Sequence, residues 1–528
     1  MAEDKRFALG LEFSTQSAKA VLLDTGDPGV AYTAKFDYET ELPGYGTAGG
    51  VLPSADPAVR HTSPAMLTEA VDVLFNRMMG DGIPLDRVGA IKLDAQQHCT
   101  VYVNDSFSSR LSHLDGRHSL VEQMRGGFSR PSAPIWEDRS PVAQAKELTS
   151  RLAGAGGIEK LTGNKAELRF PASQILKWAA EHPDEYEKSA HILVLSAYVT
   201  SLLTGTIAPV DTGDGWGTNL NSLDIAHPGW NQVVLSECEA MLSSAGARGA
   251  LEPRLGRMVS YDTVIGPVAR HFVTRYGLDP HAMVLAGTGD NPATLLGSGG
   301  EIVISLGSSY TVNGTMSRIE PSGDEEYNVF GFTPGTAMAL SVITNGGKLH
   351  SKFRDRYAGG SWKRYFELAG TALPASDEPL MLPYLYGESV PVAPAGIVRD
   401  GCDEDDGAAN IRALHWSQAL SLQLHAAHLS DVSALCIVGG GSANPFLQRA
   451  VTELFDAPTY AIANADVAAP LGCAISAARY LREESYEEAT ARFVQRDPQT
   501  VMNPEGTHKE AYRRLRDRYS ALEQAYRS

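Results

Sequence analysis

Cysteine is scarce in this chain. Its five cysteines (Cys99, Cys238, Cys402, Cys436 and Cys473) lie far apart, and none forms a CxxC pair. An odd number at such spacing argues against a disulfide framework and against a thiolate zinc site. The sequence therefore favours a reducing compartment.

Long apolar runs are also missing. No stretch reaches the roughly 18 consecutive apolar residues that a membrane-spanning helix needs. Residues 1–6 are charged and carry no apolar signal-peptide segment. We expect a cytoplasmic protein that does not cross a membrane.

Basic residues are fewer than acidic ones: the chain has 45 Lys and Arg and 63 Asp and Glu, which gives a net charge of −18. This balance argues against nucleic acid or an anionic membrane as the main partner. Nucleotide binding is not excluded, because a few backbone N–H groups can offset phosphate charge locally. A chain of 528 residues is too long for one core, so we expect two or three domains.

Several enzyme signatures are absent. The sequence has no GxxxxGK[ST] loop, no HRD motif with a downstream DFG, and no HExxH or paired Cys/His spacing. These absences exclude P-loop enzymes and protein kinases, and they leave a built-in metal centre without support.

A glycine-flanked aspartate is the most informative feature. Residues 283–286 predict a short strand, followed by Gly287-Thr288-Gly289-Asp290-Asn291-Pro292. Asn291 suits a helix N-cap and Pro292 a first helical position. Asp290 would then lie at the positive end of a helix dipole, which favours its ionised form and suits a general base. A tight strand–helix turn with a capping aspartate is the open alternative.

Two hairpins carry polar tips. Predicted strands 7–11 and 19–23 flank a hydroxyl-rich turn, and a similar turn at 306–311 follows a predicted strand at 301–305. Hydroxyls and free backbone N–H groups at such tips can cradle phosphate. Two hairpins of this kind suggest a duplicated architecture.

Other strand ends also carry candidate ligand groups. The predicted strand 88–93 leads into Gln97 and His98, where open α/β sheets place ligands, although a plain turn histidine is the alternative. The predicted strand 434–438 meets Gly439-Gly440-Gly441 before a helix at 445–454, a geometry for approaching phosphate or adenosine. The Gly/Asp-rich stretch 211–219 predicts a loop that presents polar groups, or a solvated turn.

Three further segments carry structural expectations. Residues 25–64 look irregular, 382–388 predict a loop, and 416–428 predict a long helix. The charged helix predicted at 507–526 is expected to lie on the surface; it could also mediate a homodimer.

Taken together, these parts suit phosphoryl transfer. Two phosphate-shaped hairpins and a strand–GGG–helix unit could hold a nucleotide, and one carboxylate could deprotonate an acceptor hydroxyl.

The ordered motifs LEFSTQSAK, QQH, PIWEDRS, GTGDNPATLLGSG, ISLGSSYT and VGGGSANPFLQ resemble those of the FGGY carbohydrate kinases. Within that family the chain is most similar to the xylulose kinases. Each motif alone is weak, but all six occur in the family's order, and the resemblance covers roughly residues 7–490.

The resemblance implies an α/β fold of two actin/hexokinase-like (ribonuclease H-like) domains flanking a deep cleft. It places a sugar-binding domain with the catalytic base at 1–298 and a nucleotide-binding domain at 299–528. The residues that match family positions fall into three groups. The sugar-binding group is Asp290, Asn291, Gln97, His98 and Arg169, and Asp290 is also the catalytic base. The ATP-binding group is Ser14, Thr15, Ser308, Trp362, Gly440, Gly441 and Asn444. The metal-binding group is Glu12 alone.

Glu12 departs from the family pattern, which usually has aspartate at this position beside Mg²⁺. Glutamate keeps the charge but reaches one methylene further, and Mg²⁺ tolerates poor octahedral geometry badly. Turnover or metal preference is therefore expected to differ, and Asp24 is a second acidic candidate.

The implied activity is ATP-dependent phosphorylation of a ketopentose, with Mg²⁺ as the metal ion. D-xylulose is the first candidate for the sugar substrate. Two alternatives stay open at this point. One is a kinase for another sugar or polyol, such as ribulose, glycerol or gluconate. The other is a non-catalytic member of the actin-like superfamily that binds ATP and sugar; a chaperone of that superfamily is a weaker reading.

Overall fold

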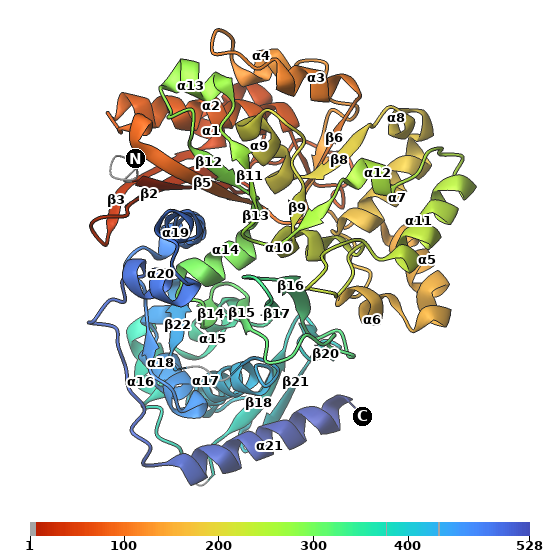
Figure 1. Ribbon diagram of the computed structural model, residues 1–528. Helices are drawn as coiled ribbons and strands as arrows, with labels where there is room; N and C mark the ends of the chain where they lie inside the picture. The colour runs from red at the N-terminus through yellow and green to blue at the C-terminus, as the bar shows by residue number, and fades with distance from the viewer. Residues whose placement is uncertain (1–6, 376, 431–432, 528) are drawn as a thin grey trace.

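Two β-sheets, each flanked by helices, form the framework of the chain in the computed structural model (Figure 1). The structure describes residues 7–375, 377–430 and 433–527. Strands of the first sheet all lie within residues 7–289, and those of the second lie within 302–460.

The first sheet is built around two parallel central strands. β1 (Phe7–Phe13) pairs in parallel with β5 (Val88–Ala95) and antiparallel with β2 (Ser17–Asp24). The order across the sheet is β3 (Val30–Asp37), β2, β1, β5 and β12 (Met283–Leu285), with β11 (Val264–Pro267) at the edge. The short strand β13 (Thr288–Gly289) extends the pairing with β5.

The second sheet repeats this order. β14 (Ile302–Leu306) pairs antiparallel with β15 (Tyr310–Thr315) and in parallel with β22 (Leu435–Val438). Next to β15 is β17 (Ala337–Ile343), next to β22 is β23 (Thr459–Tyr460), and β16 (Asn328–Gly331) is an added edge strand. With the edge strands β11 and β16 left aside, each sheet runs third, second, first, fourth, fifth in chain order, which confirms the predicted duplication.

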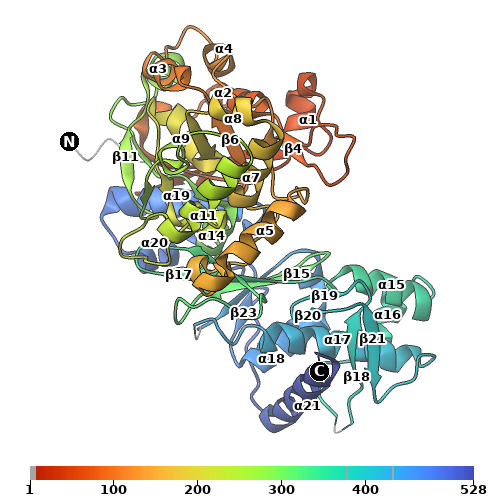
Figure 2. The ribbon, with the colours of Figure 1, turned by 90° about the vertical axis from the view of Figure 1, so that its right-hand side faces the viewer.

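Two helices lie between the lobes (Figures 1 and 2). α14 (Asp290–Gly297) packs against α19 (Ala468–Arg482), and α19 packs against β1 and β5. A Cβ on Gly472 would lie 2.0 Å from the Ala293 carbonyl oxygen, so these helices approach too closely for a side chain there. Because a late segment returns to the first sheet, the domain boundary at 298/299 stays a prediction.

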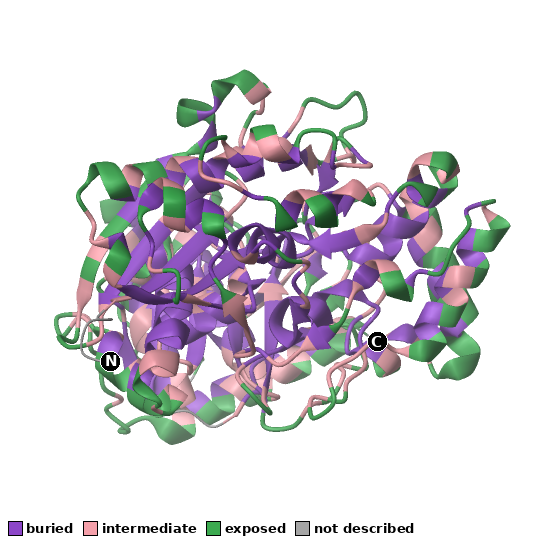
Figure 3. Cartoon of the chain, turned by 45° about the horizontal axis from the view of Figure 1, so that its top comes forward, coloured by how far each residue is buried: buried purple, intermediate pink, exposed green. Residues whose placement is uncertain are grey.

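Most of the remaining helices cover the two sheets, whereas those within 142–187 and 232–255 pack together in an apolar cluster of their own beside the first sheet (Figure 1). Buried residues follow the sheets and the inner helix faces (Figure 3). The remaining helices are α1 (Tyr38–Glu41), α2 (Pro64–Gly80), α3 (Ser106–Ser112), α4 (Leu120–Met124), α5 (Val142–Leu152), α6 (Ile158–Thr162), α7 (Pro171–Glu181), α8 (Pro183–Glu187), α9 (Leu195–Thr204), α10 (Thr212–Gly215), α11 (Gln232–Ser244), α12 (Glu252–Leu255), α13 (Arg270–Tyr276), α15 (Lys348–Tyr357), α16 (Trp362–Ala369), α17 (Gly407–Leu424), α18 (Pro445–Phe455), α20 (Tyr486–Phe493) and α21 (Lys509–Arg527). Minor strands are β4 (His61–Thr62), β6 (Thr100–Val103), β7 (Ala133–Pro134), β8 (His191–Val194), β9 (Val210–Asp211), β10 (Met258–Val259), β18 (Leu380–Tyr384), β19 (Glu388–Ser389), β20 (Val392–Ala393) and β21 (Gly396–Asp400).

Several sequence predictions were wrong. The supposedly irregular segment 25–64 contains β3, whose apolar residues Val30, Tyr32, Ala34 and Phe36 alternate as a half-buried strand requires. β18 occupies the start of the predicted loop 382–388, because it pairs with β21. α17 runs over Gly407–Leu424 rather than 416–428 and begins where the Asp406 side chain caps it.

Residues 211–219 are less exposed than expected. They form α10 and a 3₁₀ turn and are buried throughout, so they are not a solvated loop. The predicted surface helix at the C-terminal end is confirmed as α21, which packs Tyr512, Leu515 and Tyr519 against its own lobe and leaves most of its charged residues exposed. Within the described residues, no helix combines the length and apolarity needed to cross a membrane.

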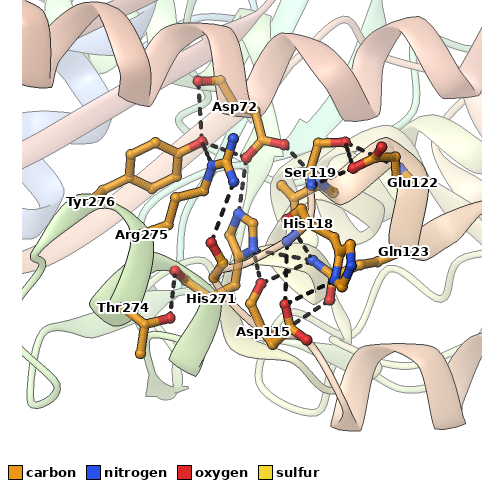
Figure 4. Close-up of polar contacts among 12 residues, drawn as sticks. Asp72, Asp115, His118, Ser119, Glu122, Gln123, His271, Thr274, Arg275 and Tyr276 are labelled. Atoms are coloured by element: carbon orange, nitrogen blue, oxygen red, sulfur yellow. Dashed lines mark hydrogen bonds and ion pairs between the residues drawn. The ribbon is translucent and has the colours of Figure 1, made fainter.

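A buried ion pair joins three helices of the first lobe (Figure 4). His271 Nε2 lies 2.9 Å from Asp72 Oδ1, which also accepts a 2.6 Å hydrogen bond from the Tyr276 hydroxyl. The second oxygen, Asp72 Oδ2, accepts from the Leu120 backbone N–H at 2.6 Å. Both side chains of the pair are buried, so α2, α4 and α13 depend on one carboxylate.

Asp72→Asn is expected to lower the free energy of unfolding by about 3–5 kcal/mol, because removing one partner of a buried ion pair leaves the other uncompensated. Urea unfolding followed by circular dichroism measures this change. Asp224→Asn is the matched control, since Asp224 pairs with His227 on the surface and no measurable loss is expected there. Equal midpoints for both variants would contradict the role given to Asp72.

Candidate active site

The loop from β12 to α14 is fixed by its neighbours on every side. The Ala286 backbone N–H donates to Thr263 O at 2.8 Å, and the Gly287 N–H donates to Thr200 Oγ1 at 3.1 Å. A Cβ on Gly287 would lie 2.6 Å from Thr200 Oγ1, and one on Gly289 would lie 2.3 Å from Gln97 Cγ. The glycines are required here for close approach, so the backbone that leads into Asp290 has little freedom.

The helix start differs from the sequence prediction. α14 begins at Asp290 with Gly289 as its N-cap, so neither Asn291 nor Pro292 has the expected position. Instead of capping, Asn291 Nδ2 donates to Gln97 Oε1 at 2.6 Å and to Asp290 Oδ1 at 3.1 Å. Gln97 is held in position to accept this hydrogen bond, because its own Nε2 donates to Gly213 O at 3.0 Å. Asp290, Asn291 and Gln97 therefore form one connected group.

Three carboxyl groups lie at the ends of adjacent strands, near enough for their charges to influence one another. Glu12 on β1 is in register with Asp94 on β5, and Asp94 is in register with Thr288, two residues before Asp290. Glu12 forms an ion pair with Lys19 at 2.8 Å. Asp94 is fully buried, and its Oδ1 finds no hydrogen-bond partner within the described part of the chain.

Burial governs the electrostatics of this cluster. Desolvation and the charge of Glu12 raise the pKa of Asp290 to about 7. Desolvation also raises the pKa of Glu12 despite Lys19, and it raises that of Asp94 well above its usual value, helped by Glu12 and Asp290. The expectation that the helix N-terminus would keep Asp290 ionised was wrong, because the helix-dipole effect is smaller than the cost of desolvation.

The donors present fit a magnesium ion that arrives with a nucleotide. Across the described residues, no three His, Cys, Asp or Glu side chains gather in a group able to hold a metal. Mg²⁺ is typically held by one or two carboxylates together with substrate phosphates. Glu12, near the end of β1, would supply one such carboxylate, whereas Asp24 lies at the far end of β2 and its predicted role stays a prediction.

His98 has a constrained backbone and a defined tautomer. It adopts a left-handed φ of 70°, and its ring stacks on Phe170 at 4.2 Å between centroids. Nδ1 lies 2.7 Å from Gly217 O, and because a carbonyl only accepts, Nδ1 carries the proton. Burial, with a smaller contribution from Arg169, lowers the pKa of His98 well below its usual value, so the ring stays neutral and Nε2 can accept a hydrogen bond from a hydroxyl group.

Arg169 links the two lobes. It precedes α7, and its Nη2 donates to Asn328 Oδ1 on β16 of the second sheet at 3.0 Å. The guanidinium also lies 5.7 Å from the centre of the Phe170 ring, next to His98. The structure thus brings Gln97, His98 and Arg169 into one region.

The predicted phosphate tips are both present. Ser14 closes the β1–β2 turn through its hydroxyl bond to Ser17 O at 2.8 Å. Thr15 Oγ1 donates to Gln96 Oε1 at 3.1 Å and accepts from Trp136 Nε1 at 3.0 Å. Ser308 is exposed in the β14–β15 turn, where its carbonyl accepts from the Lys348 N–H at 3.2 Å.

The predicted adenosine contacts lie around the start of α18. Gly440 and Gly441 follow β22, and nothing lies within 4 Å of a Cβ placed on Gly440. Asn444 caps α18, and its Nδ2 lies 3.0 Å from His415 Nε2. His415 packs against Tyr365, which packs against the exposed Trp362 with ring centres 5.4 and 5.5 Å apart. Asn444 and Trp362 are therefore connected through the rings of His415 and Tyr365, and Asn444 has a structural role that the sequence did not reveal.

A large cavity of about 930 Å³ lies elsewhere, between the segment after α14, the β16–β17 turn and α20. None of the predicted site residues lines it. It is therefore distinct from the predicted sugar and nucleotide sites.

Sequence reasoning missed Lys92, Asp94 and Asn328 as members of the site region. A signal for the first two was available, because a lysine and an aspartate two residues apart share one face of an otherwise apolar strand. Asn328 carried no signal, since its link to Arg169 joins segments 159 residues apart.

The chain is 31% identical over 537 residues to xylulose kinase of Mus musculus, across 98% of this chain and 94% of the mouse protein. It belongs to the xylulose kinase family. Membership in this family confirms the resemblance to carbohydrate kinases that the ordered motifs predicted.

Two solved kinase structures share the fold. Xylulose kinase from Rhodospirillum rubrum matches with a TM-score of 0.77 at 19% identity, over 98% of this chain and 99% of that one. Glycerol kinase from Plasmodium falciparum, solved with ADP, matches with a TM-score of 0.75 at 14% identity over 98% of each chain. The predicted α/β fold of two actin/hexokinase-like domains is confirmed. No protein-family model matches the chain.

His98 is expected to stay in the neutral Nδ1–H form throughout the pH range in which the fold persists, because burial opposes its charge. ¹⁵N chemical shifts of the histidine rings measure this directly. His425 is an internal control, since its pairing with Glu326 and Glu523 raises its pKa to about 9 and keeps it charged at neutral pH. A His98 ring that charges together with the exposed histidines would contradict the burial argument.

Proposed function

We propose that this protein transfers the γ-phosphoryl group of ATP to the terminal hydroxyl of D-xylulose, giving D-xylulose 5-phosphate and ADP. The observation that carries the proposal is the 31% identity to a xylulose kinase across 98% of this chain. The position of Asp290 as the first residue of α14, the helix that lies between the lobes in Figure 1, supports it, because a base there can face both a sugar and a nucleotide.

In the proposed reaction, Asp290 accepts the proton of the sugar hydroxyl while that oxygen attacks the γ-phosphorus. The new bond joins the sugar oxygen to phosphorus, and the bond from phosphorus to the β,γ-bridging oxygen breaks. ADP leaves, and the proton passes from Asp290 to solvent. A carboxyl pKa of about 7 suits this role, since a general base works best near the operating pH.

The remaining site residues divide between the two substrates. Neutral His98 accepts a hydrogen bond from a sugar hydroxyl at Nε2, and Arg169 and Gln97 donate to sugar oxygens. Asn291, whose amide N–H groups bind Gln97 and Asp290, accepts from a sugar hydroxyl through Oδ1. Hydroxyls and backbone N–H groups at Ser14, Thr15 and Ser308 contact the phosphates, and Trp362, Gly440, Gly441 and Asn444 form the adenosine side. Mg²⁺ held by Glu12 would neutralise phosphate charge.

Two alternatives are less favoured. A kinase for ribulose, glycerol or gluconate would share the fold, but identity of 31% over nearly the full length favours xylulose. A non-catalytic ATP- and sugar-binding protein would not need a carboxyl group with a pKa near 7.

Location in the cytoplasm and a homodimer through α21 stay predictions. The apolar face of α21 already packs within its own lobe.

A panel of sugars in a coupled ADP-release assay tests the substrate. D-xylulose is expected to give the highest kcat/KM, above D-ribulose, glycerol and gluconate, with either Mg²⁺ or Mn²⁺ present. A higher kcat/KM for another sugar would reassign the substrate, and sugar binding without ADP release would support the non-catalytic alternative.

Asp290→Asn is expected to lower kcat by about 10²–10⁴-fold, because the amide cannot accept the proton. In the unmodified protein, kcat is expected to fall as the pH drops below about 7, since a carboxyl with a raised pKa is protonated, and inactive as a base, on the acid side. Steady-state kinetics between pH 5.5 and 8.5 measure both effects. Asp27→Asn, in the exposed turn after β2, is the control and should keep full activity.

A further inference from the structure

Lys92 is a fully buried lysine on β5, one of the two central strands of the first sheet. Its ammonium group donates to Tyr261 O at 2.7 Å and to Ala286 O at 2.5 Å. It also lies 4.0 Å from the centre of the Tyr261 ring and 3.9 Å from Asp211 Oδ2. Burying a cation this completely costs desolvation free energy. The four contacts that offset this cost therefore suggest that Lys92 has a role at this position.

The contact with Ala286 completes the anchoring of the loop before Asp290. Ala286 N–H and Gly287 N–H are bound by Thr263 and Thr200, as described above. Lys92 binds the carbonyl between those two groups. Without Lys92, this carbonyl would be buried and without a charged donor, in a loop whose glycines have no side chains to hold it in place.

The contact with Asp211 leads to the same site by a second route. Asp211 caps α10 through a 2.9 Å bond from the Asp214 N–H, and the Gly213 carbonyl of α10 accepts from Gln97. Gln97 in turn accepts from Asn291, whose amide also contacts Asp290. Lys92 therefore contacts Ala286 and Asp211, from which two separate series of contacts lead to Asp290.

We propose that Lys92 is a positioning residue that holds the Asp290 loop and the α10 turn in one fixed geometry on β5. It does not contact the reacting atoms. It acts by fixing the backbone on which Asp290 and Gln97 stand. This inference rests on the proposed kinase reaction for its kinetic consequence, but its structural consequence is independent of that reaction.

The geometry explains why a small displacement would matter. Misplacing a reacting group by about 1 Å can cost 10²-fold in rate. Loss of the Lys92 contacts frees Ala286 O and Asp211 together, so both supports of the site would relax.

The test compares Lys92→Met with the double variant Lys92→Met/Asp211→Asn. Methionine keeps most of the side-chain volume, and the second substitution removes the carboxylate that would be left unpaired while keeping an oxygen able to cap α10. The single variant is expected to be less stable, and the double variant to recover much of that stability. In both, kcat for D-xylulose should fall about 10–100-fold with the KM for ATP nearly unchanged, measured where circular dichroism shows full folding.

A second readout does not depend on activity. Hydrogen exchange followed by mass spectrometry should be faster in peptides that cover residues 283–297 of the double variant and unchanged in α17. Asp72→Asn is the matched control, because it breaks a buried ion pair of the same lobe that is not connected to the Asp290 loop. It should lower stability while leaving kcat and exchange at 283–297 as in the unmodified protein.

The results distinguish the positioning role of Lys92 from the proposed kinase function. If the double variant regains both stability and kcat, or if exchange at 283–297 is unchanged, Lys92 is only a stabilising residue and the inference is overturned. If the unmodified protein phosphorylates no sugar but exchange at 283–297 rises as expected, the proposed function fails and the positioning role stands.

Discussion

Close packing around the segment that leads into Asp290 is the constraint on which the rest of the structure depends. Gly287 and Gly289 have no room for side chains, because Thr200 and Gln97 occupy that space. The loop is therefore held by neighbours from several parts of the chain rather than by its own contacts. The same close approach recurs where α14 meets α19, so the helix that begins with Asp290 is fixed at both ends.

The electrostatic character of the site follows from this packing. A short helix and its dipole favour the charged form of Asp290, but burial and the neighbouring Glu12 outweigh that effect and move its pKa to about 7. Two lysines balance the acidic cluster from different sides: Lys19 pairs with Glu12 on the hairpin, and Lys92 lies beneath the loop. A carboxyl group that ionises near neutral pH is what a proton acceptor for a hydroxyl requires.

Much of the fold and part of the site could be predicted from the sequence. The two hairpins and the strand–GGG–helix unit depend on local patterns, and β1, β5, β14 and α18 lie close to where those patterns placed them. The position of Asn291 could not be predicted, because its amide is captured by Gln97, a residue 194 positions away. Asn444 was expected to contact a nucleotide, yet the cap of α18 and His415 already engage its side chain.

The central claim is that Asp290 faces a sugar hydroxyl directly opposite the last phosphate of ATP. A crystal structure of the protein with D-xylulose and a non-hydrolysable ATP analogue measures this directly. The account predicts an Asp290 carboxylate oxygen about 2.6–3.2 Å from the terminal sugar oxygen, with that oxygen in line with the γ-phosphorus. A sugar bound elsewhere, or an Asp290 side chain turned away from it, would contradict the account.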